Sequence, residues 1–149
     1  MRVPELVYQF QRPLDAAGPT FELYQRELAA TFNGVQVRAA LSNVPKDRVL
    51  VISNVHVRSV RGGVVGITRI VINGTTNAGR VITIKNVDFV PAVGGSANLD
   101  WQGEVQLLGG GPLISTIFAD TFFDAANAAN GTTISVFGIM IPRGNIAQA

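Results

Sequence analysis

The sequence predicts an all-β fold, an antiparallel β-sandwich that forms one domain. From residue 49 almost to the end, apolar and polar residues alternate with a period of two, the spacing of strands with one buried face. Clusters of glycine, proline and asparagine interrupt this alternation at short intervals, as turns between strands do. No helical pattern separates the strands after residue 49, which excludes a parallel α/β arrangement.

Length and composition suit such a fold. A chain of 149 residues supplies one core and is short for two. The hydrophobic fraction is 47%, whereas the charged fraction of 15% is below the usual quarter or so. The surface must therefore be covered largely by neutral polar residues and glycine, as is common in proteins that live assembled or outside the cell. A net charge of +2 with 7% aromatic residues gives no reason to expect nucleic-acid binding.

The chain contains no cysteine, which excludes disulfides, thiol nucleophiles and thiolate metal sites. Its first residues do not have the pattern of a signal peptide, and no stretch approaches the ~20 apolar residues of a membrane-spanning helix. We therefore expect a protein that is soluble, or that joins a larger particle from solution, with no membrane partner and no cofactor.

The first three strands of the clear region are separated by two turns. Residues 49–60 form a valine-rich strand whose first half is apolar on both faces. Gly62 and Gly63 follow and predict a hairpin turn into a strand at 64–72. The loop 73–79 then precedes a strand at 80–90.

Three further strands follow. Residues 99–107 alternate most cleanly, and the breaker 109–112 ends that strand. Residues 113–118 predict a short strand, 119–130 a loop, and 132–141 the last strand. The inward positions of the 99–107 strand are Leu99, Trp101, Val105 and Leu107.

The first 45 residues are less regular. Residues 3–10 and 35–41 add two candidate strands. Residues 21–30 fit a short helix about as well as a strand, because Phe21, Tyr24 and Leu28 share one helical face.

About eight strands in two sheets is the strand count of a jelly roll. The predicted fold is therefore a jelly-roll-like antiparallel β-sandwich with an N-terminal arm. Residues 46–149 would form the sandwich core, and residues 1–45 would form an arm or first strands that pack on it.

Candidate catalytic groups do not assemble in the sequence. His56 is the one histidine and falls on the polar side of its strand, where a surface role is expected; a general base needs an orienting partner and a metal site needs further ligands. Asp100 and Glu104 share a strand face but lie about 13 Å apart at ~3.3 Å per residue. Glycosidase acid pairs are ~9.5 Å apart at most. We therefore predict that the chain is not an enzyme.

One predicted loop carries several side-chain oxygens. Asp120 and Asp124, followed by Asn127 and Asn130, are candidate ligands for calcium, but their spacing matches no EF-hand loop and turn or cap roles are favoured. Asn73 and Asn130 each begin an Asn-Gly-Thr triplet that fits a glycosylation sequon. Both are also expected simply as turns.

Two groups of residues are candidates for contact with a partner. Arg58, Arg61 and Arg69 flank the glycine pair and would form a small basic tip, although plain solvation of the turn is favoured. Apolar residues near the N-terminus would either bury on a neighbouring subunit or complete the sandwich, and both readings stay open. They are Val3, Leu6, Val7, Phe10, Phe21 and Leu23.

Two segments carry a family resemblance. Residues 44–55 place a proline and a polar turn before a long apolar strand, and residues 134–144 close with an apolar strand followed by Pro-Arg-Gly. Both resemble small jelly-roll virion proteins of tailed phages, of the capsid decoration or cement type. The resemblance implies a homotrimer bound to the major capsid protein on the capsid surface, assembled in the host cytoplasm. It transfers no functional residue.

The expected function is therefore that of a viral structural protein: a capsid decoration, cement or minor capsid component that stabilises the head through protein–protein contacts. The alternative is a glycan- or receptor-binding jelly-roll module of a phage fibre or spike. For that role Tyr8, Tyr24 and the loop of Asp120 and Asp124 are candidates, whereas an inward Trp101 is a poor platform. A cupin-like enzyme would need several histidines.

Overall fold

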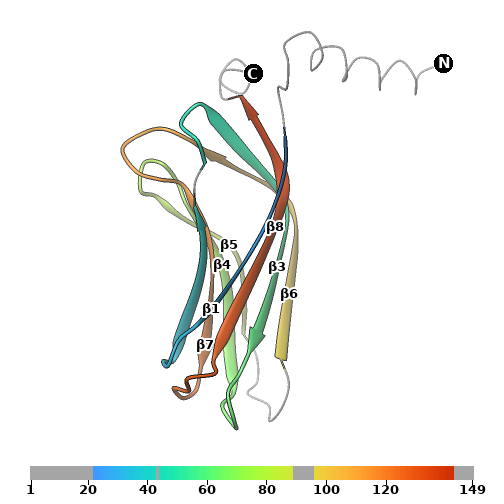
Figure 1. Ribbon diagram of the computed structural model, residues 1–149, viewed down its shortest axis with the longest axis vertical. Coiled ribbons are helices and arrows are strands. Elements are labelled where there is room, and N and C mark those ends of the chain that lie inside the picture. The colour runs from blue at the N-terminus through green and yellow to red at the C-terminus, as the bar shows by residue number, and fades with distance from the viewer. Residues whose placement is uncertain (1–21, 43, 89–95, 143–149) are drawn as a thin grey trace, which may run out of the picture.

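The computed structural model describes residues 22–42, 44–88 and 96–142, which form eight strands in two four-stranded antiparallel sheets (Figure 1). The described part contains no helix long and apolar enough to cross a membrane. The strands are β1 (Glu22–Thr31), β2 (Gln36–Ser42), β3 (Arg48–Val60), β4 (Ile67–Thr75), β5 (Val81–Asp88), β6 (Ser96–Leu108), β7 (Thr116–Phe123) and β8 (Gly131–Pro142).

The strand order makes the sandwich a jelly roll. One sheet has the order β1-β8-β3-β6 and the other β2-β7-β4-β5. The chain therefore crosses between the sheets at every connection except β4 to β5, so each sheet is built from strands that are distant in sequence. The predicted fold class is confirmed.

The hairpin predicted at Gly62 and Gly63 is wrong, because β3 and β4 belong to different sheets. Residues 61–66 instead form a crossing loop, in which Gly63 takes a positive φ of 56° and the Val65 amide donates to Gly62 O at 3.1 Å. The valines after the glycines resemble a strand, but β4 begins at Ile67 and continues through Asn73 to Thr75, past the predicted end.

Residues 119–123 lie in β7, so the loop predicted from residue 119 begins five residues too early. Leu113 and Ile114, predicted to open this strand, are instead exposed in the loop before it. The alternation of β7 is hidden in the sequence because both of its faces are buried.

The ambiguous segment at 21–30 is settled in favour of a strand. Residues 22–31 pair with β8 along their whole length, from Glu22 opposite Met140 to Thr31 opposite Gly131. Backbone pairing with a long partner strand outweighs the weak helical spacing of the apolar residues. The β2 strand confirms the prediction at residues 35–41.

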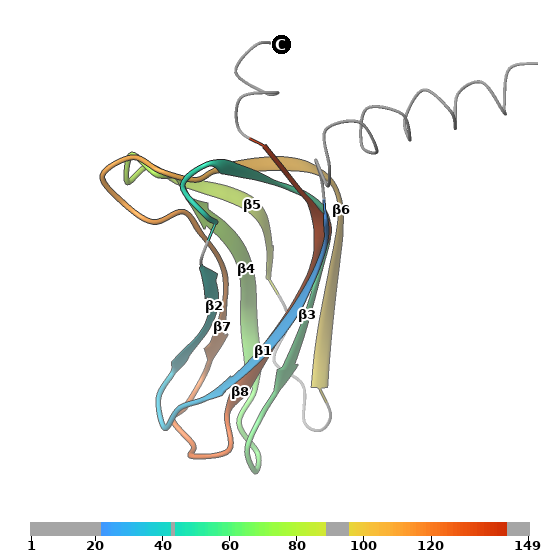
Figure 2. The same cartoon turned by 45° about the horizontal axis from the view of Figure 1, so that its top comes forward.

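The core lies between the sheets and combines the inward faces of both (Figure 2). The inward positions predicted for β6 are confirmed: Leu99 and Leu107 are buried, while Trp101 and Val105 are half-buried against the core. The largest fully buried side chains include Leu50, Ile52, Ile70, Ile72, Ile117 and Ile134.

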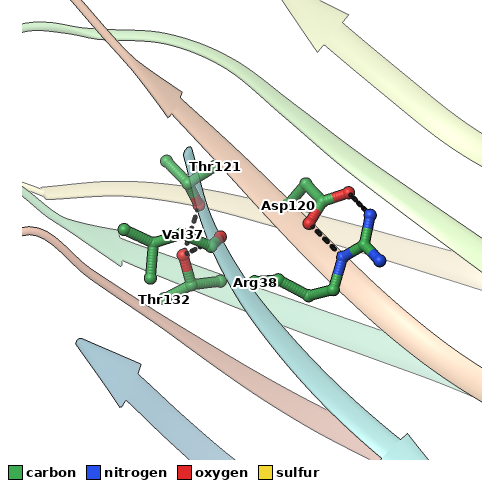
Figure 3. Close-up of polar contacts among 5 residues, drawn as sticks. All are labelled: Val37, Arg38, Asp120, Thr121 and Thr132. Atoms are coloured by element: carbon green, nitrogen blue, oxygen red, sulfur yellow. Dashed lines mark hydrogen bonds and ion pairs between the residues drawn. The ribbon is translucent and has the colours of Figure 1, made fainter. Parts of the chain in front are cut away.

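A chain of buried hydroxyl groups joins the two sheets. Thr132 on β8 donates its proton to Val37 O on β2 at 3.0 Å, and its oxygen lies 2.8 Å from the hydroxyl of Thr121 on β7 (Figure 3). The Ser59 hydroxyl on β3 is 2.6 Å from that of Thr121. Because each hydroxyl has one proton, the donors run from Ser59 to Thr121 to Thr132 to Val37 O. All three hydroxyl residues are buried, so this chain satisfies polar groups that the core would otherwise leave unpaired.

Replacing Thr121 with valine keeps the side-chain shape but removes the middle of this chain. We expect Thr121→Val to lower the free energy of unfolding by about 1–3 kcal/mol, because the buried Ser59 hydroxyl loses its partner. Urea denaturation measures this. The control is Thr133→Val, on the outer face of β8, for which a change within about 0.5 kcal/mol is expected. Equal effects of the two variants would contradict the account.

Candidate functional site

On the outer face of the β1-β8-β3-β6 sheet, four apolar side chains from β1, β3 and β8 gather in the half nearest the start of β1, beside the polar residues Gln25, Ser53 and Gln106. Leu23 on β1 lies opposite Ile139 on β8, which in turn lies opposite Val51 on β3, and Phe137 is in the adjacent row. Leu23 is 81% exposed, and the other three are half-buried. We call Leu23, Val51, Phe137 and Ile139 the apolar face. They line a shallow groove of about 420 Å³.

The other half of the same outer face is polar. Glu27, Ser135, His56 and Asp100 form one row across all four strands. The Ser135 hydroxyl donates to Glu27 Oε2 at 3.0 Å, and His56 Nδ1 lies 2.5 Å from Asp100 Oδ1. Strand register thus gives His56 a partner that sequence reasoning missed.

This row holds a serine, a histidine and an aspartate, but it lacks the connections of a catalytic triad. A nucleophile must hydrogen-bond to its base, whereas Ser135 donates to Glu27 and not to His56. The orienting aspartate of a triad is buried, whereas the Asp100 side chain is 70% exposed. The row is therefore a surface polar network, as expected for a strand histidine.

The two calcium candidates do not share a loop. Asp120 lies within β7, and its two carboxylate oxygens accept from Arg38 Nε at 2.8 Å and Nη2 at 3.0 Å (Figure 3). This hydrogen bond raises the pKa of Arg38 above its ordinary value. Asp124 lies in the β7–β8 loop and accepts from the Gly66 amide at 2.8 Å. Within the described residues, no three histidine, aspartate or glutamate side chains gather as a metal site.

The outer face of the second sheet is covered by its own arginines. The Arg38 guanidinium lies 4.2 Å from the centre of the Phe118 ring, and that of Arg69 lies 4.2 Å from the centre of the Phe122 ring. Stacked guanidinium groups shield aromatic rings from water and add a cation–π attraction. This face therefore presents polar groups where the apolar face of the first sheet presents hydrocarbon.

The β1–β2, β3–β4 and β7–β8 loops lie at one end of the sandwich (Figures 1 and 2). The side chain of Asn130 forms hydrogen bonds with all three. Its Oδ1 accepts from the Gly62 amide at 3.0 Å, and its Nδ2 donates to Gly34 O and to Ala125 O, both at 3.1 Å. Those partners come from the β1–β2, β3–β4 and β7–β8 loops. Asn130 is fully buried, and its side-chain oxygen and nitrogen both have hydrogen-bond partners. These bonds hold the three loops together at this end. The burial of Asn130 also conflicts with its glycosylation, and Asn73 lies within β4 rather than in a turn.

The predicted contact residues lie on separate surfaces. Leu23 stands on the apolar face, and Arg58 is exposed on the polar half of the same sheet. Arg61 is half-buried and donates from Nη1 to Val65 O at 2.7 Å, while Arg69 stacks on the second sheet, so no basic tip assembles. The candidates that fall outside the described residues are Val3, Leu6, Val7, Phe10 and Phe21.

In the described part of the chain, the aromatic rings proposed for glycan binding are not exposed for a sugar to stack on. Tyr24 is buried with Arg26 over its ring, and burial raises the pKa of its hydroxyl while Arg26 opposes that shift. Trp101 is half-buried against the core. Tyr8 lies outside the described residues.

The chain matches no family model and no curated protein. Among solved structures, a structure of infectious bursal disease virus Gt strain is 13% identical over 84% of this chain, with a TM-score of 0.38. The VP2 subviral particle of infectious bursal disease virus is 11% identical over 84%, with a TM-score of 0.37. This chain spans 33% and 34% of those two chains. Likeness at this level does not establish kinship, and the jelly-roll assignment rests on strand order.

Replacing Asn130 with aspartate tests the loop junction. Asn130→Asp keeps the acceptor for Gly62 but loses both donated bonds and places a carboxylate against the carbonyls of Gly34 and Ala125. We expect a loss of about 1–3 kcal/mol in the free energy of unfolding, measured by thermal and urea denaturation.

The control for this variant is Asn127→Asp in the same loop. The Asn127 side chain uses its oxygen, which accepts from the Ala129 amide at 2.9 Å, and aspartate keeps that acceptor. A change within about 0.5 kcal/mol is expected. If Asn127→Asp were as destabilising as Asn130→Asp, the junction would not depend on the donated bonds.

Proposed function

We propose that this chain is a structural protein of a virus particle and that it attaches to the capsid through its apolar face. The observation that carries the proposal is a hydrocarbon surface on the first sheet that no described residue covers, whose most prominent member, Leu23, is 81% exposed. An exposed apolar surface beside a polar one is typical of a protein–protein contact. The continuous apolar run at residues 49–52 is typical of a strand buried on both faces, yet Val51 is only half-buried in the free chain.

Jelly rolls serve as capsid proteins, lectins and cupins, and the described residues favour the first of these. A cupin holds its metal with several histidines, and His56 is alone in this sequence. A lectin displays aromatic rings for sugars to stack on, whereas Tyr24 is buried and Trp101 is half-buried. The glycan-binding alternative therefore has no described feature in its favour.

The finer form of the proposal is a decoration, cement or minor capsid component on the capsid surface. Its partners would be the major capsid protein and further copies of itself, as a homotrimer. Apolar residues of the segment 1–21, such as Leu6 and Phe10, are further candidates for contact with such a partner.

The direct experiment is to purify virus particles from cells that carry the gene and to probe them with an antibody against the full chain. The proposal expects the chain to sediment with the particles and immunogold labels to lie on the head. Recovery in the particle-free fraction would overturn it. Binding to a sugar on a glycan array, with or without calcium, would instead favour the glycan-binding alternative.

Leu23→Glu tests the apolar face itself. Because Leu23 is exposed in the free chain, the variant should fold normally and lose particle binding by roughly 10-fold or more, the value of burying one leucine. Co-sedimentation of the full chain with virus particles from which the native copies of this protein have been removed measures this binding. The control is Leu113→Glu, a 52% exposed leucine in the β6–β7 loop, which should bind as the unaltered chain does. Equal binding by both variants would contradict the assignment.

A further inference from the structure

The loops that meet at Asn130 carry exposed apolar side chains that are separate from the apolar face. We call residues 32–35, 61–66 and 124–130 the loop end (Figures 1 and 2). Phe32 is 61% exposed, Val35 53% and Val64 84%. Four exposed alanines between 125 and 129 surround the junction on the β7–β8 loop.

The loop end carries no net charge. Arg61 and Asp124 are its charged residues, one of each sign. Arg61 donates to Val65 O and Asp124 accepts from the Gly66 amide, and these hydrogen bonds orient the two charges without neutralising them. The loops at the opposite end of the sandwich differ, because they include the charged residues Lys46, Asp47 and Arg80.

Hydrogen bonds also join the loops of the loop end to one another. Besides the three bonds of Asn130, the Phe123 amide donates to Val35 O at 2.7 Å, and the Phe32 amide donates to Asn130 O at 3.1 Å. The Asp124 amide donates to Gly66 O at 3.0 Å, in return for the bond that its carboxylate accepts. A surface fixed in this way loses little conformational entropy when it binds.

We propose that the loop end of one copy binds the loop ends of further copies of this chain around a rotation axis. Near such an axis each group meets its own equivalent, so a surface with a net charge would face the same net charge. A surface with no net charge avoids that repulsion, and alanines let the backbones approach closely. An interface with a strongly charged partner would instead be expected to display a complementary net charge, which the loop end lacks. This contact lies apart from the apolar face and holds whether or not the chain binds a capsid.

Val64→Asp tests the contact, since it places a charge at the most exposed apolar position of the loop end. Sedimentation velocity of the full chain over a range of concentrations should show an oligomer for the unaltered chain and a monomer for Val64→Asp. The matched control is Val81→Asp, at a 60% exposed valine on β5 outside these loops, which should remain oligomeric. A second pair, Ala126→Asp against Ala78→Asp, compares exposed alanines at the two ends.

Two results would overturn the proposal: an unaltered chain that stays monomeric, or a Val64→Asp variant that stays oligomeric. A monomer that floats with phosphatidylcholine–phosphatidylserine vesicles would assign the loop end to lipid instead. Particle binding separates this proposal from the proposed function. Val64→Asp should keep binding through Leu23, and Leu23→Glu should keep the oligomer.

Discussion

The buried amide of Asn130 is the interaction on which one whole end of this molecule depends. A jelly roll crosses between its sheets at nearly every connection, so loops distant in sequence must meet at each end. Here three of them meet around one side chain that is fully buried and uses both its oxygen and its nitrogen. Two residues further on, Thr132 belongs to the hydroxyl chain with Thr121 and Ser59 that joins the two sheets inside the core. The Asn130 amide thus holds the loops of this end together, and the hydroxyl chain holds the two sheets together beneath them. Together they give a small surface without net charge a defined shape.

The outer faces of the two sheets differ in whether their apolar side chains are covered within the single chain. On the second sheet, Arg38 is held by Asp120 and covers Phe118, so the face is already satisfied in the single chain. On the first sheet, the row from Leu23 to Val51 has no such cover in the described residues. We propose that an assembly covers the apolar face and that the protein acts through this contact. Such a role requires no chemistry at His56, whose partner Asp100 is solvent-exposed.

Periodicity predicted the all-β class and most strands because one buried face imposes a period of two, as β6 shows with Leu99 and Leu107. It could not predict that β7 continues past residue 118, where Arg38 makes an outward Asp120 compatible with a strand. The glycine pair at Gly62 and Gly63 predicted a hairpin because glycine permits a chain reversal, but it permits a crossing loop equally well. Among candidate site residues, Leu23 was predicted, whereas the rest of the apolar face depends on the register of β8 against β1 and β3.

Hydroxyl-radical footprinting of the chain, free and on intact particles, tests the central claim that the apolar face is covered in the assembled state. Mass spectrometry would compare oxidation of Leu23, Phe137 and Ile139 with that of Leu113, which is exposed in the β6–β7 loop. The account predicts several-fold protection of the apolar face on particles and unchanged oxidation of Leu113. Equal oxidation of the apolar face in both states would contradict it.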